Sequence, residues 1–372
     1  MRPRALLPLV AALFTGYAAV ATGGAGDDPV VAPGSAVRLP EDAGAHPEFR
    51  TEWWYVTGWL ATEAGAARGF QLTFFRTRPT GVRGNPSAFA AKELLIAHAA
   101  VSDPAERRLR YDERIARAGF GLAAAEQGRM AVHIRDWQLE ERDGRVLAVV
   151  HAQGFAFELA LVSSGPPLVN GAQGYSQKGP SPTSASLYYS LPQLRVQGRL
   201  VRDGRTEAVT GSAWLDHEWS SSYLDPQSVG WDWIGINLAD GGALMAFRIR
   251  DVNGAARWAG GTLRAADGTT RALAPADVEF VPGRRWRSPY NAADYPVEWR
   301  VRAGPLEFSL APLMDDQVSD SRLTTGALYW EGAVEARAAG RAIGRGYLEL
   351  TGYGARLTLG DGSDSREKAP LY

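Results

Sequence analysis

The chain has 372 residues, 45% of them hydrophobic, and 40 basic against 41 acidic side chains give it a formal net charge of −1. It therefore has no basic excess to bind nucleic acid and no acidic tail, and no nucleic-acid partner is expected. Cysteine is absent, which excludes thiol nucleophiles, thiolate metal sites and disulfides.

The first 25 residues have the pattern of a secretory signal peptide. Arg2 and Arg4 precede an apolar run over 5–14, and the Ala-Val-Ala at 19–21 offers a small-residue cleavage site. An uncleaved membrane anchor is the alternative, although the run is short for a spanning helix. We expect a periplasmic or secreted protein, a location that also allows association with the envelope membrane or with a transporter.

The rest of the chain reads as short alternating runs separated by Gly, Pro and Asp-Gly turns, a pattern typical of all-β proteins. Such runs lie at 53–60, 70–76, 147–160, 194–201, 233–238, 243–250 and 306–310. One segment, 106–118, has Leu109, Ile115 and an arginine pair at helical spacing. We predict one short helix there.

A weak internal repeat relates two parts of the chain. Three residues of one part match three of the other at one offset: Trp53, Tyr55 and Leu60 with Trp231, Trp233 and Leu238. The match continues with Phe75-Arg76 and Phe247-Arg248. Two antiparallel barrels in tandem would explain it, and such a barrel can hold a small apolar ligand. A chance match between two tryptophan-rich hairpins is the alternative.

The expected organisation follows from these patterns and from the length, which suggests two domains. After the signal peptide at 1–25 we expect a linker at 26–47, a first barrel at 48–222, a second barrel at 226–356 and a tail at 357–372.

The segment 214–219, Trp-Leu-Asp-His-Glu-Trp, places two carboxyl groups and an imidazole between two indoles. In a strand, Trp214, Asp216 and Glu218 share one face, with neighbours roughly 6.5 to 7 Å apart, whereas His217 and Trp219 share the other. Two acids at this range in a dry setting raise at least one pKa and keep a proton available for donation. A strand end whose acids face water or cap a turn is the alternative.

Other catalytic signatures are weaker. The five histidines lack the close spacing of a metal-binding pair, so no metal is expected. His98 is expected to be a core histidine with satisfied hydrogen bonds rather than a proton shuttle. Ser176 and Lys178 are expected on a loop, either as turn residues or as part of a lid. Hydrolysis by a serine triad is not expected, because no Gly-x-Ser-x-Gly elbow occurs.

Eight segments together resemble the secreted lipocalin-like proteins of the AttH and carotenoid 1,2-hydratase superfamily, which includes a predicted secreted hydrolase group. The segments are 52–58, 97–103, 174–179, 186–190, 214–219, 230–233, 329–332 and 346–353. The resemblance covers about residues 49–356. It implies an all-β fold of two lipocalin-like barrels in tandem.

The resemblance also implies a role for the Asp-His-x-Trp motif at 216–219. In the hydratases its Asp protonates a trisubstituted alkene, and this role falls here on Asp216. Those enzymes carry Asn where this chain has Glu218, which predicts a more anionic, better hydrated and less acidic site. We expect Asp216, Glu218 and His217 as catalytic candidates, with Glu218 coupled to Asp216 and His217 holding structure or orienting a neighbour. The expected reaction is water addition or isomerisation, without a cofactor.

The expected ligand is an apolar small molecule with an isoprenoid or acyl chain. The ligand-binding candidates are aromatic: Trp54, Tyr188, Tyr189, Trp214, Trp219, Trp231 and Trp233. Plain core packing is the alternative for these rings. For the whole protein, a non-catalytic carrier and a partner-binding surface protein are the alternatives. The sequence leaves the oligomeric state open.

Overall fold

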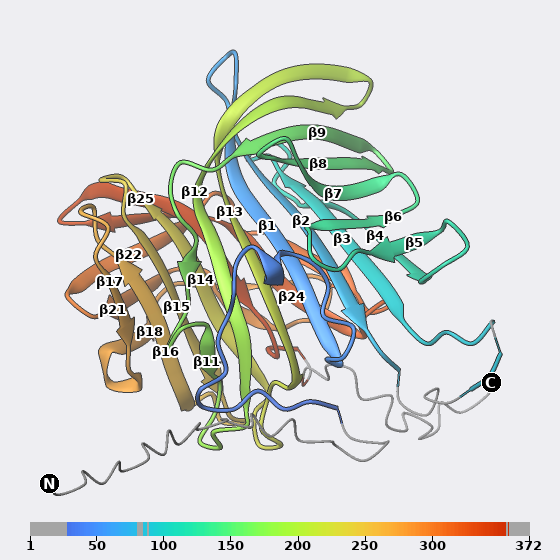
Figure 1. The fold of residues 1–372 in the computed structure, drawn as a ribbon. Coiled ribbons are helices and arrows are strands. Elements are labelled where there is room, and N and C mark those ends of the chain that lie inside the picture. The colour runs from blue at the N-terminus through green and yellow to red at the C-terminus, as the bar shows by residue number, and fades with distance from the viewer. Residues whose placement is uncertain (1–27, 80–84, 88, 355, 357–372) are drawn as a thin grey trace, which may run out of the picture.

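The computed structural model describes residues 28–79, 85–87, 89–354 and 356. The signal peptide and the tail predicted at 1–25 and 357–372 lie outside the described residues. Within them, two antiparallel sheets carry the architecture, and each curves toward a barrel (Figure 1). The fold is all-β, with two lipocalin-like barrels in tandem, which confirms the predicted fold class.

Sheet A comprises 13 strands within the described residues, in the order β4-β3-β2-β1-β13-β12-β9-β8-β7-β6-β5, with β10 and β11 also paired to β12. Their bounds are β1 (Thr51–Thr62), β2 (Ala67–Thr77), β3 (Leu94–Ser102), β4 (Arg110–Arg117), β5 (Ala123–Ala125), β6 (Ala131–Ile134), β7 (Trp137–Arg142), β8 (Arg145–Ala152), β9 (Phe155–Val162), β10 (Leu168–Val169), β11 (Tyr175–Gln177), β12 (Ala185–Arg202) and β13 (Arg205–Ser222). A short 3-10 turn, η1 (Glu41–Ala43), precedes them.

Sheet B follows in the order β17-β16-β15-β14-β25-β24-β22-β21-β18, with β23 paired to β24. Its strands are β14 (Gly230–Leu238), β15 (Ala243–Arg250), β16 (Ala256–Arg264), β17 (Thr270–Leu273), β18 (Val278–Pro282), β21 (Trp299–Ala303), β22 (Leu306–Pro312), β23 (Val318–Ser321), β24 (Ala327–Ala338) and β25 (Arg341–Leu350). A second 3-10 turn, η2 (Pro275–Asp277), precedes β18. The strands β19 (Arg285–Arg287) and β20 (Asp294–Pro296) form a separate two-stranded hairpin.

Burial along the strands shows which faces are covered. In β9 buried and half-buried residues alternate, as expected for a sheet with one face on the core. By contrast, β1 is buried along nearly its whole length. Trp54 and Val56 pack into the apolar interior of the first barrel, whereas Tyr55 and Trp59 pack against residues of sheet B. The strands β1 and β13 are therefore covered on both faces.

Direct hydrogen bonds join the two sheets. The Trp59 Nε1 atom donates to the carbonyl oxygen of Gly346 at 3.0 Å. The Asn237 side-chain amide donates to the carbonyl oxygen of Ala213, also at 3.0 Å. Together with the aromatic layer between the sheets, these bonds fix the relative position of the two walls of any cavity between them.

The helix predicted over 106–118 is wrong, because the segment contains strand β4, which pairs with β3. Its arginines reach across to other strands: Arg110 pairs with Asp203 at 2.7 Å, and the Arg114 guanidinium lies over the Trp137 ring. The helical spacing was a local coincidence, and partners distant in sequence decided the conformation. Among the described residues no helix has the length and apolar character to cross a membrane.

The two sheets repeat one hairpin arrangement. In β1 and β2, Trp53 faces Phe75 in the pairing register. In β14 and β15, Trp233 faces Phe247. The register therefore equates Trp53 with Trp233, two positions beyond the match that the sequence suggested. The strands β13 and β25 occupy equivalent places beside β1 and β14.

Candidate active site: a cavity between the two sheets

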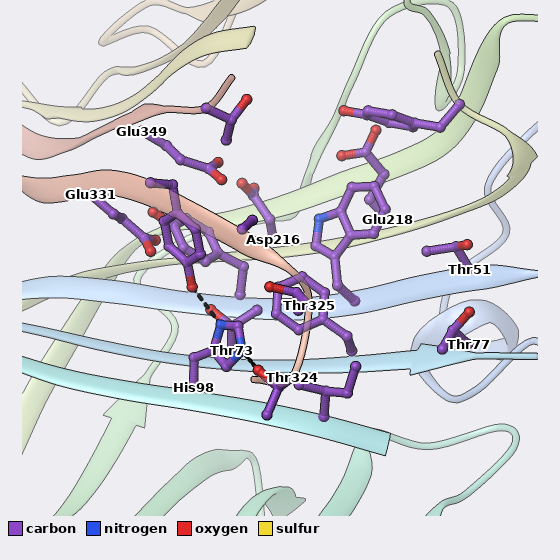
Figure 2. Close-up of a pocket in the computed structure, with 18 of the residues that line it drawn as sticks. Thr51, Thr73, Thr77, His98, Asp216, Glu218, Thr324, Thr325, Glu331 and Glu349 are labelled. Atoms are coloured by element: carbon purple, nitrogen blue, oxygen red, sulfur yellow. Dashed lines mark hydrogen bonds between the residues drawn. The ribbon is translucent and has the colours of Figure 1, made fainter. Parts of the chain in front are cut away.

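A cavity of about 450 Å³ lies between the two sheets (Figure 2). This volume is in the range of roughly 300–1,000 Å³ that is common for small-molecule sites. Its walls combine aromatic and aliphatic side chains with threonines, one histidine and four acids. The lining residues are Thr51, Trp53, Tyr55, Thr73, Phe75, Thr77, Pro79, Leu94, Ile96, His98, Ile115, Asp216, Glu218, Tyr223, Trp231, Trp233, Thr324, Thr325, Ala327, Tyr329, Glu331, Glu349 and Thr351.

Asp216 is buried on the β13 wall of this cavity and accepts hydrogen bonds from three groups. Its Oδ1 accepts from the Ser190 hydroxyl at 2.5 Å and from the Trp214 indole at 2.6 Å. Its Oδ2 accepts from the Tyr188 hydroxyl at 2.8 Å, which itself accepts from the Trp233 indole at 3.1 Å. All of these donors are neutral, so no cation is paired directly with Asp216.

Burial raises the pKa of Asp216 to about 7, although the hydrogen bonds from Ser190, Trp214 and Tyr188 oppose the rise. The negative charge of Glu218 adds to it, as the sequence pattern predicted, but is the smaller cause. Loss of water around the ionised form is the dominant effect. Near neutral pH the protonated, proton-donating form of Asp216 and its ionised form are therefore present in comparable amounts.

Glu218 lies on the same face of β13 and, unlike Asp216, is paired with a cationic side chain. Its Oε1 is 3.0 Å from Lys178 Nζ and accepts a hydrogen bond from the Ser186 hydroxyl. Burial raises the pKa of Glu218, and Lys178 opposes that rise. Burial also disfavours the charged form of Lys178 and therefore lowers its pKa. The Lys178 ammonium lies 4.2 Å from the centre of the Phe247 ring. Glu218 and Lys178 thus form a buried ion pair beside Asp216.

Two further acids line the cavity from sheet B. Glu331 on β24 stands directly opposite Glu349 on β25 in the strand pairing. Burial and the charge of Glu349 raise the pKa of Glu331 well above its ordinary value. Burial also raises the pKa of Glu349 to about 7, with Asp216 and Glu218 contributing. In Figure 2 these two acids lie beside each other to the left of Asp216.

His98 lines the cavity from β3. Its ring hydrogen-bonds with the Tyr329 hydroxyl and, at 2.9 Å, with the Thr324 hydroxyl, the two dashed bonds of Figure 2. Burial lowers the pKa of His98 to about 3, so the ring is neutral at pH 7. It has the satisfied hydrogen bonds expected of it, although it faces the cavity and not a closed core.

His217 lies on the opposite face of β13, as the strand alternation predicted, and does not line the cavity. Its Nε2 donates to Glu52 Oε1 at 2.8 Å, and its Nδ1 is 3.2 Å from the Tyr189 hydroxyl. Glu52 also receives a hydrogen bond from Arg76 Nε at 2.7 Å. Burial lowers the pKa of His217 despite its bond to Glu52.

His217, Glu52 and His46 form a second cluster, on the face of β1 and β13 that points away from the cavity. Three of the aromatic ligand candidates pack against this second cluster. The Trp54 ring stacks on His217 with centroids 4.7 Å apart, and Trp219 stacks on His46 at 3.8 Å. Tyr189 packs edge-on against His217. Of the other candidates, Trp231 and Trp233 line the cavity, and Trp214 and Tyr188 support Asp216 through hydrogen bonds.

The second cluster also contains the one set of metal-ligand atoms found among the described residues. Atoms of His46, Glu52 and His217 lie within 4.8 Å of one another. However, Glu52 Oε1 already accepts from both imidazoles, and its Oε2 accepts from Arg76 and from the His46 backbone amide. A buried guanidinium at 2.7 Å opposes a cation at the same carboxylate, so the donor set fits hydrogen bonding better than metal binding.

Sequence reasoning missed Glu331, Glu349 and the role of Lys178. Ser176 lies in strand β11 and not on the predicted loop, whereas Lys178 follows that strand outside regular structure, as predicted, and is buried against Glu218. The signal for the two glutamates was present, because each is a single acid in an apolar stretch that also carries the family resemblance. Asp216 was singled out by a stronger signal, because a second acid lies on the same strand face and indoles flank both.

Known proteins resemble the chain over most of its length. Residues 30–353 match the AttH-like family. The crystal structure of a protein from Nitrosomonas europaea, provisionally assigned as AttH, is 50% identical with a TM-score of 0.82, covering 87% of this chain and 99% of that one. No curated protein gives a match.

Two solved structures share the fold at low identity. Kievitone hydratase from Nectria haematococca is 14% identical with a TM-score of 0.66, covering 88% of this chain and 97% of that chain. The protein CghA is also 14% identical, with a TM-score of 0.50, covering 87% and 95%. At this identity the likeness establishes the fold.

Proposed function

The chain belongs to the AttH-like family, and from this premise we propose that it catalyses acid-initiated addition of water to a carbon–carbon double bond, or isomerisation of that bond, in an apolar ligand. Asp216 is the proton donor. The observation that carries the proposal is a buried carboxyl on a cavity wall with a pKa of about 7 and only neutral donors around it. The shared fold of kievitone hydratase, a hydratase by name, supports the same reaction class.

The chemistry of the walls suits this reaction. Protonation of a substituted alkene leaves a carbocation, which aromatic faces stabilise through their negative π clouds. Tyr55, Trp231 and Trp233 present such rings to the cavity. In the ion pair of Glu218 with Lys178, Glu218 lines the cavity and Lys178 does not, so the developing positive charge meets the negative end of the pair.

The lining also indicates the kind of ligand. Phe75, Leu94 and Ile96 give the cavity apolar surface, and Thr324 and Thr325 add hydroxyl groups. This combination fits a chain-like apolar molecule, isoprenoid or acyl, with a polar group at one end. We place the protein in the periplasm or outside the cell, on the basis of its signal-peptide pattern. Fractionation of cells that express the tagged chain tests that location.

The direct test of function is turnover of a panel of isoprenoid and unsaturated acyl alkenes in H₂¹⁸O, followed by mass spectrometry. Water addition gives a product that carries ¹⁸O, and isomerisation gives a product of unchanged mass with a different retention time; either should be lost in Asp216→Asn by about 10²- to 10⁴-fold, as for loss of a general acid. Asp143→Asn, the same change at an exposed turn residue, is the matched control and should leave the rate unchanged. A wild-type rate in folded Asp216→Asn contradicts the proposal.

A carrier without catalysis is the second candidate, and the apolar part of the cavity favours it. The two functions differ at Asp216, which a carrier does not need. Native mass spectrometry of the purified protein before and after lipid extraction distinguishes them. A bound lipid recovered unchanged from both wild type and Asp216→Asn, without turnover of the panel, supports the carrier.

A further inference from the structure

The cavity contains a second pair of acids that the proposed role of Asp216 does not use. Glu331 and Glu349 face each other across β24 and β25, so their Cβ atoms are about 4.5–5.5 Å apart. Both line the cavity on the sheet B wall. Glu331 Oε1 is buried without a hydrogen bond of ordinary geometry among the described residues, and the neighbouring Tyr55 hydroxyl only partly opposes the effect of burial on the pKa of Glu331. An orphaned carboxyl oxygen at a cavity wall is costly to keep unless it has a use.

The two sheets place these acids at related positions. On β13, Glu218 pairs with Trp53 of β1. On β25, Glu349 pairs with Trp233 of β14. The β1–β2 and β14–β15 registers make Trp53 and Trp233 equivalent, as described above. Each barrel therefore contributes an acid at the same place in its sheet, and the two walls meet at one cavity.

We propose that Glu331 and Glu349 are the second proton-exchanging group of this cavity, taking the proton that the attacking water releases after Asp216 has protonated the alkene. This inference rests on the proposed function. It adds a base to the site and assigns that base to sheet B.

The step balances without any further reactant. Asp216 gives its proton to one alkene carbon, the π bond breaks, and the other carbon becomes cationic. Water forms the C–O bond, and one of its O–H bonds breaks as its proton passes to an ionised carboxylate of the glutamate pair. Transfer of that proton from the pair back to Asp216 restores the starting state, so the sum is alkene plus water giving alcohol.

The charges around Glu331 and Glu349 favour a state in which the two carboxyl groups together hold one proton. Among the described residues, the charges of Asp216 and Glu218 from β13 act on the pair. The charges of the pair in turn act on four tyrosines: Tyr55 from β1, Tyr223, Tyr329 from β24 and Tyr347 from β25. None of these is a cation. Two carboxyl groups at close range without a cation cannot both ionise readily, so their protons leave in two separate steps. The Coulomb effect of Asp216 on Glu349 links the two proton sites.

The first arm of the test needs no substrate. Protein labelled with ¹³C at the glutamate side-chain carboxyls is titrated by NMR, and signals are assigned by their loss in Glu331→Gln and Glu349→Gln. We expect two separated steps for the pair, and Glu349→Gln should move the remaining Glu331 signal toward lower pH. Two cavity glutamates that titrate together at the ordinary glutamate pKa would overturn the proposal.

The second arm measures turnover on the alkene panel. Glu331→Gln and Glu349→Gln should each slow the reaction by about 10²-fold or more and move the acidic limb of its pH profile to lower pH, where the remaining glutamate titrates, with ligand affinity unchanged. Glu335→Gln, on the same strand but outside the cavity, is the control. If Asp216→Asn is inactive while both variants keep wild-type rate and profile, only this inference fails. If Asp216→Asn is active, the proposed function fails.

Discussion

The two faces of the paired strands β1 and β13 hold buried carboxyl groups in opposite states: Glu52 of β1 on the inner face, which carries His217, and Asp216 of β13 on the cavity face. On the inner face, burial alone would raise the pKa of Glu52, but its bonds to His217 and His46 and the charge of Arg76 lower it below its usual range. On the cavity face, burial raises the pKa of Asp216 to about 7, because its partners are neutral donors. Equal burial therefore leaves Glu52 a permanent anion and Asp216 an available acid, because Glu52 has two imidazoles and a guanidinium as partners and Asp216 has only neutral donors.

The inner face should respond to substitution through stability. Glu52→Gln removes the buried one of the two carboxylates that pair with Arg76, leaving Glu93, and removing one partner of a buried ion pair typically costs about 3–5 kcal/mol. We expect that loss in the free energy of unfolding measured by denaturant titration at pH 7. Glu63→Gln, at an exposed position, serves as the control. A loss below about 1 kcal/mol would show that the cluster carries little stability.

On the cavity face, replacing the buried acid should make the protein more stable relative to wild type as the pH rises. The folded pKa of Asp216 lies above its unfolded value of 3.8, so the folded state binds more protons and wild-type stability falls as pH rises from about 4 to about 7. A neutral amide escapes this loss. The stability of Asp216→Asn relative to wild type should therefore rise across that window by up to roughly 4 kcal/mol and then level off. A difference that is flat with pH contradicts the assignment.

The coupling between the two acids of the cavity face is smaller. Glu218 raises the pKa of Asp216 through its charge, but less than burial does. Glu218→Gln should therefore lower the pKa of Asp216 and move the basic limb of the turnover profile to lower pH, with a rate change at pH 7 of about tenfold or less. A shift to higher pH would show that Glu218 is not ionised beside Asp216.

Two neighbouring tyrosines on β12, one on each face, test the comparison through the smallest expected effects. Tyr188 donates to Asp216 on the cavity face, and Tyr189 meets His217 on the inner face. Tyr188→Phe removes a donor that favours the ionised acid, so the turnover profile should move to higher pH. Tyr189→Phe should leave the profile unchanged and cost about 1 kcal/mol in unfolding free energy. Equal effects of the two changes on the profile would contradict the separation of the faces.

Local pattern was sufficient for the strands and for the shared face of Asp216 and Glu218, because strand alternation depends only on neighbours in sequence. It failed at 106–118, where pairing with β3 outweighed helical spacing. It also missed Glu331 and Glu349, since their meeting with Asp216 depends on how sheet B packs on sheet A. Trp219 and Tyr189 were chosen by residue type, although alternation already placed Trp219 on the His217 face.

The most direct measurement is the titration of Asp216 itself. Protein labelled with ¹³C at the aspartate carboxyls, with Asp216→Asn to assign the signal, gives the pKa of this one group by NMR. The account predicts a value of about 7. A value at or below the ordinary 3.8 would show that Asp216 is a permanent anion like Glu52 and does not donate a proton at neutral pH.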